Sequence, residues 1–328
     1  MFSAMPRCFF IVLLFPTIVC SQDAQTLRSR ANLVVVPTLV KDVHGHVIYG
    51  LTAKDFVIED NGVPQTVRLD DSAEFEPLSI VVALQTGRRA KREYSRIHGI
   101  TSLIGPLLEQ PETQVAVVEF DSHVRLVSGF TQDATVLKKV FGELQPGDGG
   151  SAILDAIKFS VDLLENEQGE RQRVLLLVSE ARDHGSHTAS VDGVLASIGK
   201  SNAIMHSISF SPALSHLLDT ERGSNRDEMT YRPDLLAPLL LARNAMKKNI
   251  TKTVTEMSGG EYQLFDSRKQ FETEMVDFTN RIHSRYSLSF EPHTPPPGLH
   301  RIRVELKEPI EGVTVTFRSS YWATAGAN

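Results

Sequence analysis

Residues 78–92 read LSIVVALQTGRRAKR, and this stretch decides the fold. Its first half follows Pro77 and is apolar and rich in β-branched residues, which predicts a fully buried strand. The Thr-Gly pair after it predicts a turn into a charged helix start. A buried strand that turns sharply into a helix is where an α/β sheet builds its binding site. The turn, residues 85–89, offers Gln, Thr, Gly, Arg and Arg, where a metal-binding or catalytic site would usually show carboxylates or hydroxyls.

Strand-like and helix-like segments alternate along the chain after this stretch. The strand-like runs are residues 115–120, 124–130, 174–178, 203–210 and 261–265, and apolar residues at helical spacing fill the intervals. Only three residues separate the first two runs, too few for a helix, so these runs are expected to pair antiparallel at one edge of the sheet. The pattern predicts an α/β fold over residues 77–285. We expect a Rossmann-like, doubly wound, mostly parallel sheet with one antiparallel edge strand.

Two segments of this block stand out by their length. Residues 234–257 show helical periodicity without a break, which predicts one long helix that ends at the Gly-Gly pair 259–260. The polar insertion at residues 211–232 is too long for a routine connection, and long insertions are usually functional or mobile. We therefore include this insertion in the candidate binding surface.

Short strands are expected on both sides of the α/β block. Residues 31–71 are rich in β signals and contain Asn61-Gly62, the strongest short signal for a hairpin turn. Residues 286–323 return to strands of similar length, interrupted by a Pro-rich break. Because chain termini usually lie close together, we expect the two flanks to pair into one small β module, with the block 77–285 inserted between them.

The N-terminus carries a processing signal. Arg7 precedes an apolar run at residues 8–20 that is too short to span a bilayer, so residues 1–21 are predicted to be a signal peptide. Lipidation at Cys20 is the less favoured alternative, because Val19 stands where a small residue is expected. No later apolar run suits a transmembrane helix, so the protein is expected to be secreted or periplasmic. Its net charge of −6 gives no reason to expect nucleic acid as a partner.

Four local sequences carry a resemblance to a known family. They are VAVVEF at 115–120, GSAILDAI at 150–157, VLLLVSE at 174–180 and TEMSGGEY at 255–262. Together with the predicted order of strands and helices, they resemble a von Willebrand factor type A domain. The segments GLTAKDF at 50–56, EDNGVPQ at 59–65 and RSSY at 318–321 resemble the flanks of a secreted bacterial family of proteins related to this domain. The resemblance implies protein interaction or adhesion without catalysis.

Domains of this family usually hold Mg²⁺ or Mn²⁺ at a metal-ion-dependent adhesion site, where a partner's carboxylate completes the coordination. The resemblance places this site at five positions, which are Gln85, Gly87, Arg89, Ser151 and Glu180. Only Ser151 and Glu180 keep oxygens suited to a hard cation. Arg89 would bring a positive charge to the cation's place, and two such charges about 4 Å apart repel by several kcal/mol near a protein surface. The site is therefore degenerate, and no metal cofactor is expected.

The arginines of the turn leave two arrangements open. Arg88 or Arg89 could occupy the vacated cation position and pair with Glu180, or both could point to solvent. Mg²⁺ or Mn²⁺ would bind only if replacement ligands exist, and Asp121 and Asp183 are the nearby candidates.

The favoured function is a non-enzymatic interaction domain that binds an unidentified protein or surface ligand without metal. Its expected contact surface is the top of the sheet together with the insertion at residues 211–232. The cationic residues Arg88, Arg92 and Arg96 near a helix start oppose the helix dipole, which makes them a candidate patch for an anionic partner.

The alternative is a metal-dependent binder or hydrolase whose site lies near Glu180, Asp183, His184 and His187. Two His residues beside an Asp could bind Zn²⁺. On an irregular loop after a strand, however, such residues are more often polar connectors, and the sequence contains no motif of a known catalytic nucleophile.

Overall fold

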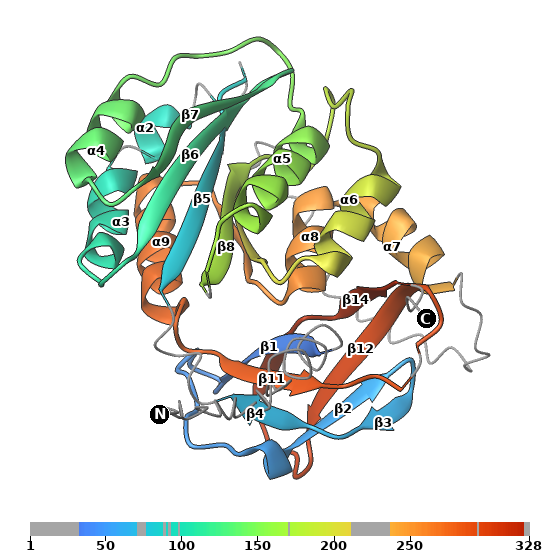
Figure 1. Cartoon of the computed structure of the whole chain (residues 1–328). Helices are drawn as coiled ribbons and strands as arrows, with labels where there is room; N and C mark the ends of the chain where they lie inside the picture. Colours follow the sequence, from blue (N-terminus) through green and yellow to red (C-terminus); the bar gives the residue numbers. More distant parts are fainter. Residues whose placement is uncertain are drawn as a thin grey trace, which may run out of the picture. The chain divides into compact units, whose positions relative to one another are not determined.

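A six-stranded sheet with the order β10-β9-β8-β5-β6-β7 forms the centre of the α/β domain (Figure 1). The computed structural model describes residues 33–70, 77–87, 90, 93–97, 99–169, 171–210, 237–293 and 295–324. The strands are β5 (Leu78–Gln85), β6 (Gln114–Phe120), β7 (Val124–Thr131), β8 (Gln172–Ser179), β9 (Ile204–Phe210) and β10 (Tyr262–Phe265). Neighbours pair in parallel except β6 and β7, which pair antiparallel at one edge. The predicted α/β fold with one antiparallel edge strand is confirmed.

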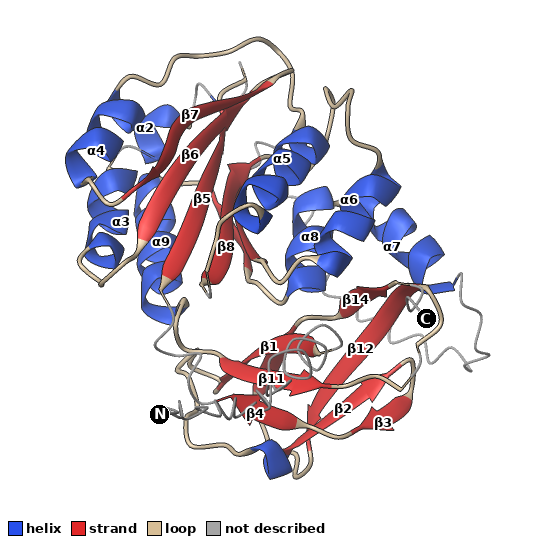
Figure 2. Ribbon diagram, viewed as in Figure 1, coloured by secondary structure: helices blue, strands red, loops and turns tan. Residues whose placement is uncertain are grey.

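Helices cover both faces of this sheet (Figure 2). One face carries α5 (Ile153–Glu165), α6 (Val191–Lys200), α7 (Ala237–Lys248) and α8 (Ile250–Ser258), and the other carries α2 (Tyr94–Ile97), α3 (Ile100–Leu108), α4 (Ala134–Gly142) and α9 (Arg268–Arg281). Val81 of β5 packs in the core between the sheet and α5–α8. Its neighbours Ile80 and Val82 pack in the core on the opposite face, which carries α9. Burying each large aliphatic side chain stabilises the fold by about 1.5–3 kcal/mol, which explains why β5 is apolar without alternation.

The single helix predicted over residues 234–257 is wrong, because the described part of this segment forms two helices, α7 and α8, that meet at Asn249. Asn249 has an extended backbone, and its Oδ1 accepts from the backbone N–H of Lys252 at 2.9 Å. A side chain that caps a helix start replaces a backbone bond and so favours a break in the helix. Both helices pack on the same core, so the apolar period continues across the break and hides it from the sequence.

The two flanks form the β module, which we define as β1–β4 and β11–β14. Its two sheets have the orders β13-β1-β11-β4 and β14-β12-β2-β3, so each contains strands from both ends of the sequence (Figure 1). The strands are β1 (Val34–Lys41), β2 (Phe56–Asp60), β3 (Val63–Gln65), β4 (Arg68–Asp70), β11 (Tyr286–Phe290), β12 (Gly298–Leu306), β13 (Thr314–Phe317) and β14 (Ser320–Ala323). Val36, Ile58, Leu288 and Phe290 belong to its shared core. The predicted fold class therefore holds for the flanks as well.

Charged side chains connect the β module to the α/β domain within one compact unit, Val34–Asn328. Arg318 is 4% exposed and donates from Nη2 to the carbonyl of Gly199 at 2.7 Å. Lys41 Nζ lies 2.5 Å from Oε1 of Glu261, the residue just before β10. A buried charge that loses its partners costs several kcal/mol, so these contacts fix the junction.

Several predictions fall outside the described residues. They concern the signal peptide 1–21 with Cys20, the insertion 211–232, and the side chains of Arg88, Arg89 and Arg92. Within the residues that the structure describes, no helix has both the length and the apolar character needed to cross a membrane.

Candidate functional site

The carboxyl ends of β5 and β8 meet at a reciprocal pair of hydrogen bonds between Gln85 and Glu180. The Gln85 amide donates from Nε2 to Oε1 of Glu180 at 2.8 Å, and its Oε1 accepts from the Glu180 backbone N–H at 2.9 Å. Gln85 is 2% exposed. Both ends of the amide are thus engaged, and its carbonyl oxygen already has a donor. A carboxylate at this position would face the same N–H but would repel the carboxylate of Glu180.

Gly87 lies where the chain leaves β5 and comes close to the loop before α5. A Cβ built on Gly87 would stand 2.2 Å from the carbonyl oxygen of Gly150, well inside contact distance. No side chain fits unless the loop at residues 147–150 moves. Gly87 therefore offers no side chain as a ligand, and the described structure leaves no space for one.

Ser151 follows that loop and is fully buried. Its backbone exchanges hydrogen bonds with His184, at 3.3 Å and 3.0 Å. Its Oγ has no hydrogen-bond partner among the described residues. His184 in turn brings Nε2 to 3.5 Å from Oε1 of Glu180. Ser151, His184, Glu180 and Gln85 thus form one connected group at the end of β8, and they supply few of the free oxygens that a hard cation needs.

The arginine patch is described only at Arg96. Its Nη1 donates to Oε2 of Glu93 at 2.6 Å, and the Glu93 side chain is only 8% exposed. Arg96 is therefore held by its own helix start. The pairing of Arg88 or Arg89 with Glu180 lies outside the described residues and stays a prediction.

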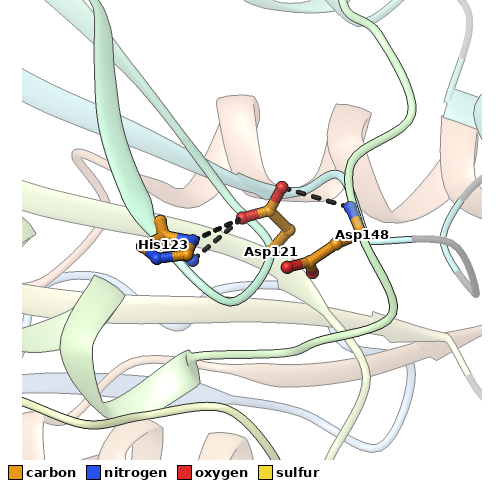
Figure 3. Close-up of side chains that lie close together, drawn as sticks. All are labelled: Asp121, His123 and Asp148. Carbon is orange, nitrogen blue, oxygen red and sulfur yellow. Dashed lines mark hydrogen bonds and ion pairs between the residues drawn. The ribbon is translucent and has the colours of Figure 1, made fainter.

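A second group of possible ligands consists of Asp121, His123 and Asp148 (Figure 3). One ligand atom from each lies within 4.8 Å of the others. Asp121 is 4% exposed; its Oδ1 accepts from the His123 N–H at 2.8 Å and its Oδ2 from the Asp148 N–H at 3.3 Å. Backbone hydrogen bonds, chiefly from Gly150, hold the pKa of Asp148 below its ordinary value. The carboxylates thus tie the turn 121–123 to the loop 147–150, as carboxylates commonly do in loops.

Asp121 was predicted as a replacement ligand, but His123 and Asp148 were not singled out from the sequence. Asp148 lies in the turn sequence Gly-Asp-Gly-Gly, which signals only a break between helices. Its approach to Asp121 depends on the sheet, because parallel strands bring loops from distant parts of the chain to the same edge.

The alternative set of Asp183, His184 and His187 is not assembled as a metal site in the described structure. Across the described ranges, Asp121, His123 and Asp148 are the only three such residues whose ligand atoms lie within 4.8 Å of one another. Asp183 instead accepts at Oδ1 from the N–H of Leu154 at 3.1 Å and from the hydroxyl of Ser186 at 2.5 Å. It holds the start of α5, which is a structural role.

Asp155 was missed by the sequence reasoning and organises the loop after β8. It is 7% exposed and accepts backbone N–H bonds from His187 at 2.9 Å and from Ala189 at 2.6 Å. Thr188 adds a third N–H at 3.1 Å. Burial raises the pKa of Asp155, but these backbone bonds outweigh it and the net pKa lies below its ordinary value. The sequence signal was a lone Asp in the first turn of an apolar helix.

We call residues 85–87, 121–123, 147–152 and 180–189 the sheet rim. Short backbone bonds connect these segments: Gly147 donates to Thr86 at 2.7 Å, and Ala152 donates to Asp121 at 2.7 Å. The rim thus presents exposed His123, His184 and His187 on loops that are held by buried carboxylates. Such an arrangement is suited to binding a partner with little loss of loop entropy.

Comparison with known families gives one match: residues 85–182 match the model of the von Willebrand factor type A domain. The matched segment contains Gln85, Gly87, Ser151 and Glu180. No protein of curated function matches the sequence significantly.

Solved structures of similar fold share little sequence with this chain. An aerotolerance-related membrane protein from Bacteroides fragilis is 16% identical, with 62% of this chain and 99% of that chain covered and a TM-score of 0.41. Proximal thread matrix protein 1 from the mussel byssus, with a zinc-occupied adhesion-site motif, is 12% identical, with 70% and 51% covered and a TM-score of 0.46. The pilus adhesin SpaC from Lactobacillus rhamnosus is 11% identical, with 75% and 34% covered and a TM-score of 0.43.

Proposed function

The chain contains a von Willebrand factor type A domain, and on that premise we propose that it is a non-enzymatic interaction protein that binds a partner protein at the sheet rim without a metal ion. The observation that carries this proposal is the double hydrogen bond between Gln85 and Glu180. It fills the first ligand position with a neutral amide whose oxygen and nitrogen are both engaged.

The rest of the rim supports metal independence. The carbonyl of Gly150 occupies the space beside Gly87, and Ser151 offers a single hydroxyl. Mg²⁺ demands near-octahedral oxygen coordination and loses its waters reluctantly, so one hydroxyl and one carboxylate already bound to an amide are a poor site.

The same residues support a binding role over a catalytic one. The buried carboxylates Asp121 and Asp155 accept backbone N–H bonds that fix the shape of their loops, and for Asp155 these bonds hold the pKa below its ordinary value. A general base needs a pKa close to the working pH, and such bonds move the pKa of a carboxyl away from it.

We propose in addition that the protein is exported, on the basis of the signal sequence at residues 1–21, with a lipid anchor at Cys20 as the alternative. An exported interaction domain meets its partner in the periplasm or outside the cell. The partner is expected to contact His184 and His187, because their loop is exposed and is held in one conformation by Asp155.

Capture of partners from an extracytoplasmic fraction tests the proposal. Immobilised wild-type protein is compared with His184→Ala/His187→Ala, which alters the rim, and with His44→Ala/His46→Ala, which alters an exposed turn of the β module. We expect the wild type and the turn variant to capture the same protein in EDTA, and the rim variant to lose it. Capture that requires Mg²⁺ or Mn²⁺, or that survives the rim substitutions, would contradict the proposal.

A further inference from the structure

Three polar side chains form a buried cluster in the core of the β module. His300 on β12 is 3% exposed, Asp60 on β2 is 7% exposed and Tyr321 on β14 is 4% exposed. His300 Nδ1 lies 2.8 Å from Oδ1 of Asp60, and the Tyr321 hydroxyl donates to Oδ2 of Asp60 at 2.7 Å. Nε2 of His300 lies 2.7 Å from the carbonyl of Pro296. The cluster thus joins three strands and the loop before β12.

Both ring nitrogens of His300 face acceptors. A carbonyl oxygen can only accept, so Nε2 must carry a proton. A carboxylate also accepts, so its hydrogen bond with Nδ1 requires a second proton on the ring. Burial alone lowers the pKa of His300, but the hydrogen bonds to Asp60 and Pro296 and the charge of Asp60 raise it above its ordinary value overall. His300 and Asp60 therefore form a buried ion pair, with the Tyr321 hydroxyl on the other carboxylate oxygen.

The cluster also contains the partner that His300 would take after losing a proton. Asn61 accepts at Oδ1 from the Arg301 N–H at 3.0 Å, which fixes the orientation of its amide. Its Nδ2 therefore points to Nδ1 of His300, at 3.1 Å. This contact becomes a hydrogen bond only when Nδ1 is bare, and the Nδ1 lone pair would then face the Asp60 carboxylate at 2.8 Å. The two protonation states therefore favour different hydrogen bonds at Nδ1, to Asp60 when the nitrogen is protonated and from Asn61 when it is not.

Strand β14 connects this cluster to the α/β domain through its alternating faces. Tyr321 pairs with His300 and packs in the core of the β module, whereas its neighbour Trp322 pairs with Leu299 and packs against the core beneath α6. A Cβ on Gly199 would lie 2.9 Å from the Cβ of Trp322, so helix and strand are in close contact. A displacement of the β14 backbone at Tyr321 would therefore also move Trp322 against α6.

We propose that the His300 proton holds β14 in place, so that its loss as pH rises loosens the contact between Trp322 and α6. The cluster acts as a pH-sensitive latch between the β module and the α/β domain. The latch does not depend on what binds at the sheet rim. The groups that face His300 are Asp60 from β2 and Tyr321 from β14, and the Arg318 charge acts in turn on Tyr321.

The direction of the effect follows from linkage. A histidine whose pKa is raised in the folded state contributes stabilisation that is fully present below its unfolded pKa of about 6.5. That stabilisation is lost as pH rises through the folded pKa. The latch is therefore closed below about pH 6.5 and opens as pH rises through the folded pKa of His300.

Trp322 is the single tryptophan of the chain and reports directly on the latch. Its fluorescence is recorded from acid to alkaline pH in the wild type, in His300→Gln, and in the matched control His46→Gln, whose side chain is 78% exposed in the same module. We expect a red shift of the emission with the steepness of one proton and a midpoint above about pH 6.5. The shift should be lost in His300→Gln and kept in His46→Gln. The same transition in His300→Gln would overturn the proposal.

A measurement on the wild type covers the case in which His300→Gln fails to fold. Nitrogen-15 NMR of the histidine rings distinguishes the imidazolium from the neutral tautomers. We expect both nitrogens of His300 to be protonated at pH 6, and Nδ1 to lose its proton together with the fluorescence change. A neutral His300 at pH 6, or a titration that leaves Trp322 unaffected, would overturn the proposal.

Discussion

The sheet rim and the β module use buried carboxylates in different ways. Asp121 in the rim and Asp155 in α5 accept backbone N–H bonds from rim residues, so each fixes the path of a rim loop. In the module, Asp60 accepts from the side chains of His300 and Tyr321, so it joins strands whose residues lie 240 and 261 positions away in sequence. We therefore expect the stability of the rim to fall in acid, where carboxylates gain protons. The stability of the module should instead fall as pH rises and histidine loses a proton.

The junction between the two regions should show the largest effect. Arg318→Met leaves the carbonyls of Gly199 and Ser320 without their buried donor, at contacts of 2.7 Å and 2.9 Å in the native protein. Each unsatisfied buried acceptor costs about 1–3 kcal/mol, so we expect a loss of roughly 3 kcal/mol in the free energy of unfolding. Urea denaturation measures it. The control Arg301→Met alters an exposed arginine of β12 and should change stability by less than about 0.5 kcal/mol. Equal effects would show that the module is not fixed through Arg318.

The carboxylate of Asp155, which holds the rim loop 187–189 from α5, should give the next largest effect. Asp155→Asn replaces a carboxylate that accepts three consecutive backbone N–H groups, and an amide oxygen cannot serve them all. We expect a loss of about 2 kcal/mol and faster amide hydrogen exchange at His187, Thr188 and Ala189. Asp162→Asn, on the exposed face of the same helix, is the control. Backbone amide exchange that stays as slow in Asp155→Asn as in the wild type would show that this side chain does not hold the rim loop.

The same carboxylate should make the free energy of unfolding depend on pH in acid, whereas the dependence that comes from the β module appears at higher pH. Because the pKa of Asp155 is lowered, its stabilisation is present above its unfolded value of about 3.9 and is lost as pH falls through the folded value. Wild-type stability should therefore fall more steeply than that of Asp155→Asn below about pH 4. Parallel curves for the two proteins between pH 5 and pH 2 would contradict this assignment.

Close packing at Gly87 should give a smaller effect. Gly87→Ala places a methyl group 2.2 Å from the Gly150 carbonyl, so the loop 147–150 must shift, at an expected cost of about 1–2 kcal/mol. Gly105→Ala, in α3, meets nothing within 4 Å and should stabilise the helix by up to about 1 kcal/mol. Thermal melts of both variants measure the difference. A neutral Gly87→Ala would mean that a ligand side chain could fit at this position after all.

Much of the fold could be predicted from local sequence because burial on both faces leaves a continuous apolar run, as in β5, and helices leave a period of 3.6. The break at Asn249 could not be predicted, because both helices face one core and a capping side chain leaves no mark on the apolar period. The pairing of the two flanks was accessible only as an expectation from the usual closeness of chain ends.

The sequence singled out positions for the candidate site, but it did not predict the contacts between them. The positions of Gln85, Gly87, Ser151 and Glu180 followed from a family resemblance, whereas the bond between Gln85 and Glu180 depends on the pairing of β5 with β8. Asp155 and the cluster of His300 with Asp60 were missed because their partners lie 32 or more residues away in sequence. Single-sequence patterns carry no such register information.

Calorimetric titration with Mn²⁺ is the direct test of whether the sheet rim works without a metal ion, because Mn²⁺ binds the oxygen sites that Mg²⁺ prefers. Wild-type protein is compared with Ser151→Ala, which removes the buried hydroxyl beside His184, and with Asp148→Ala, which removes one member of the Asp121, His123 and Asp148 group. We expect no saturable binding to the wild type at micromolar Mn²⁺ and no difference among the three proteins. Stoichiometric micromolar binding that is lost in Ser151→Ala or in Asp148→Ala would contradict it, and the affected variant would identify which group holds the ion.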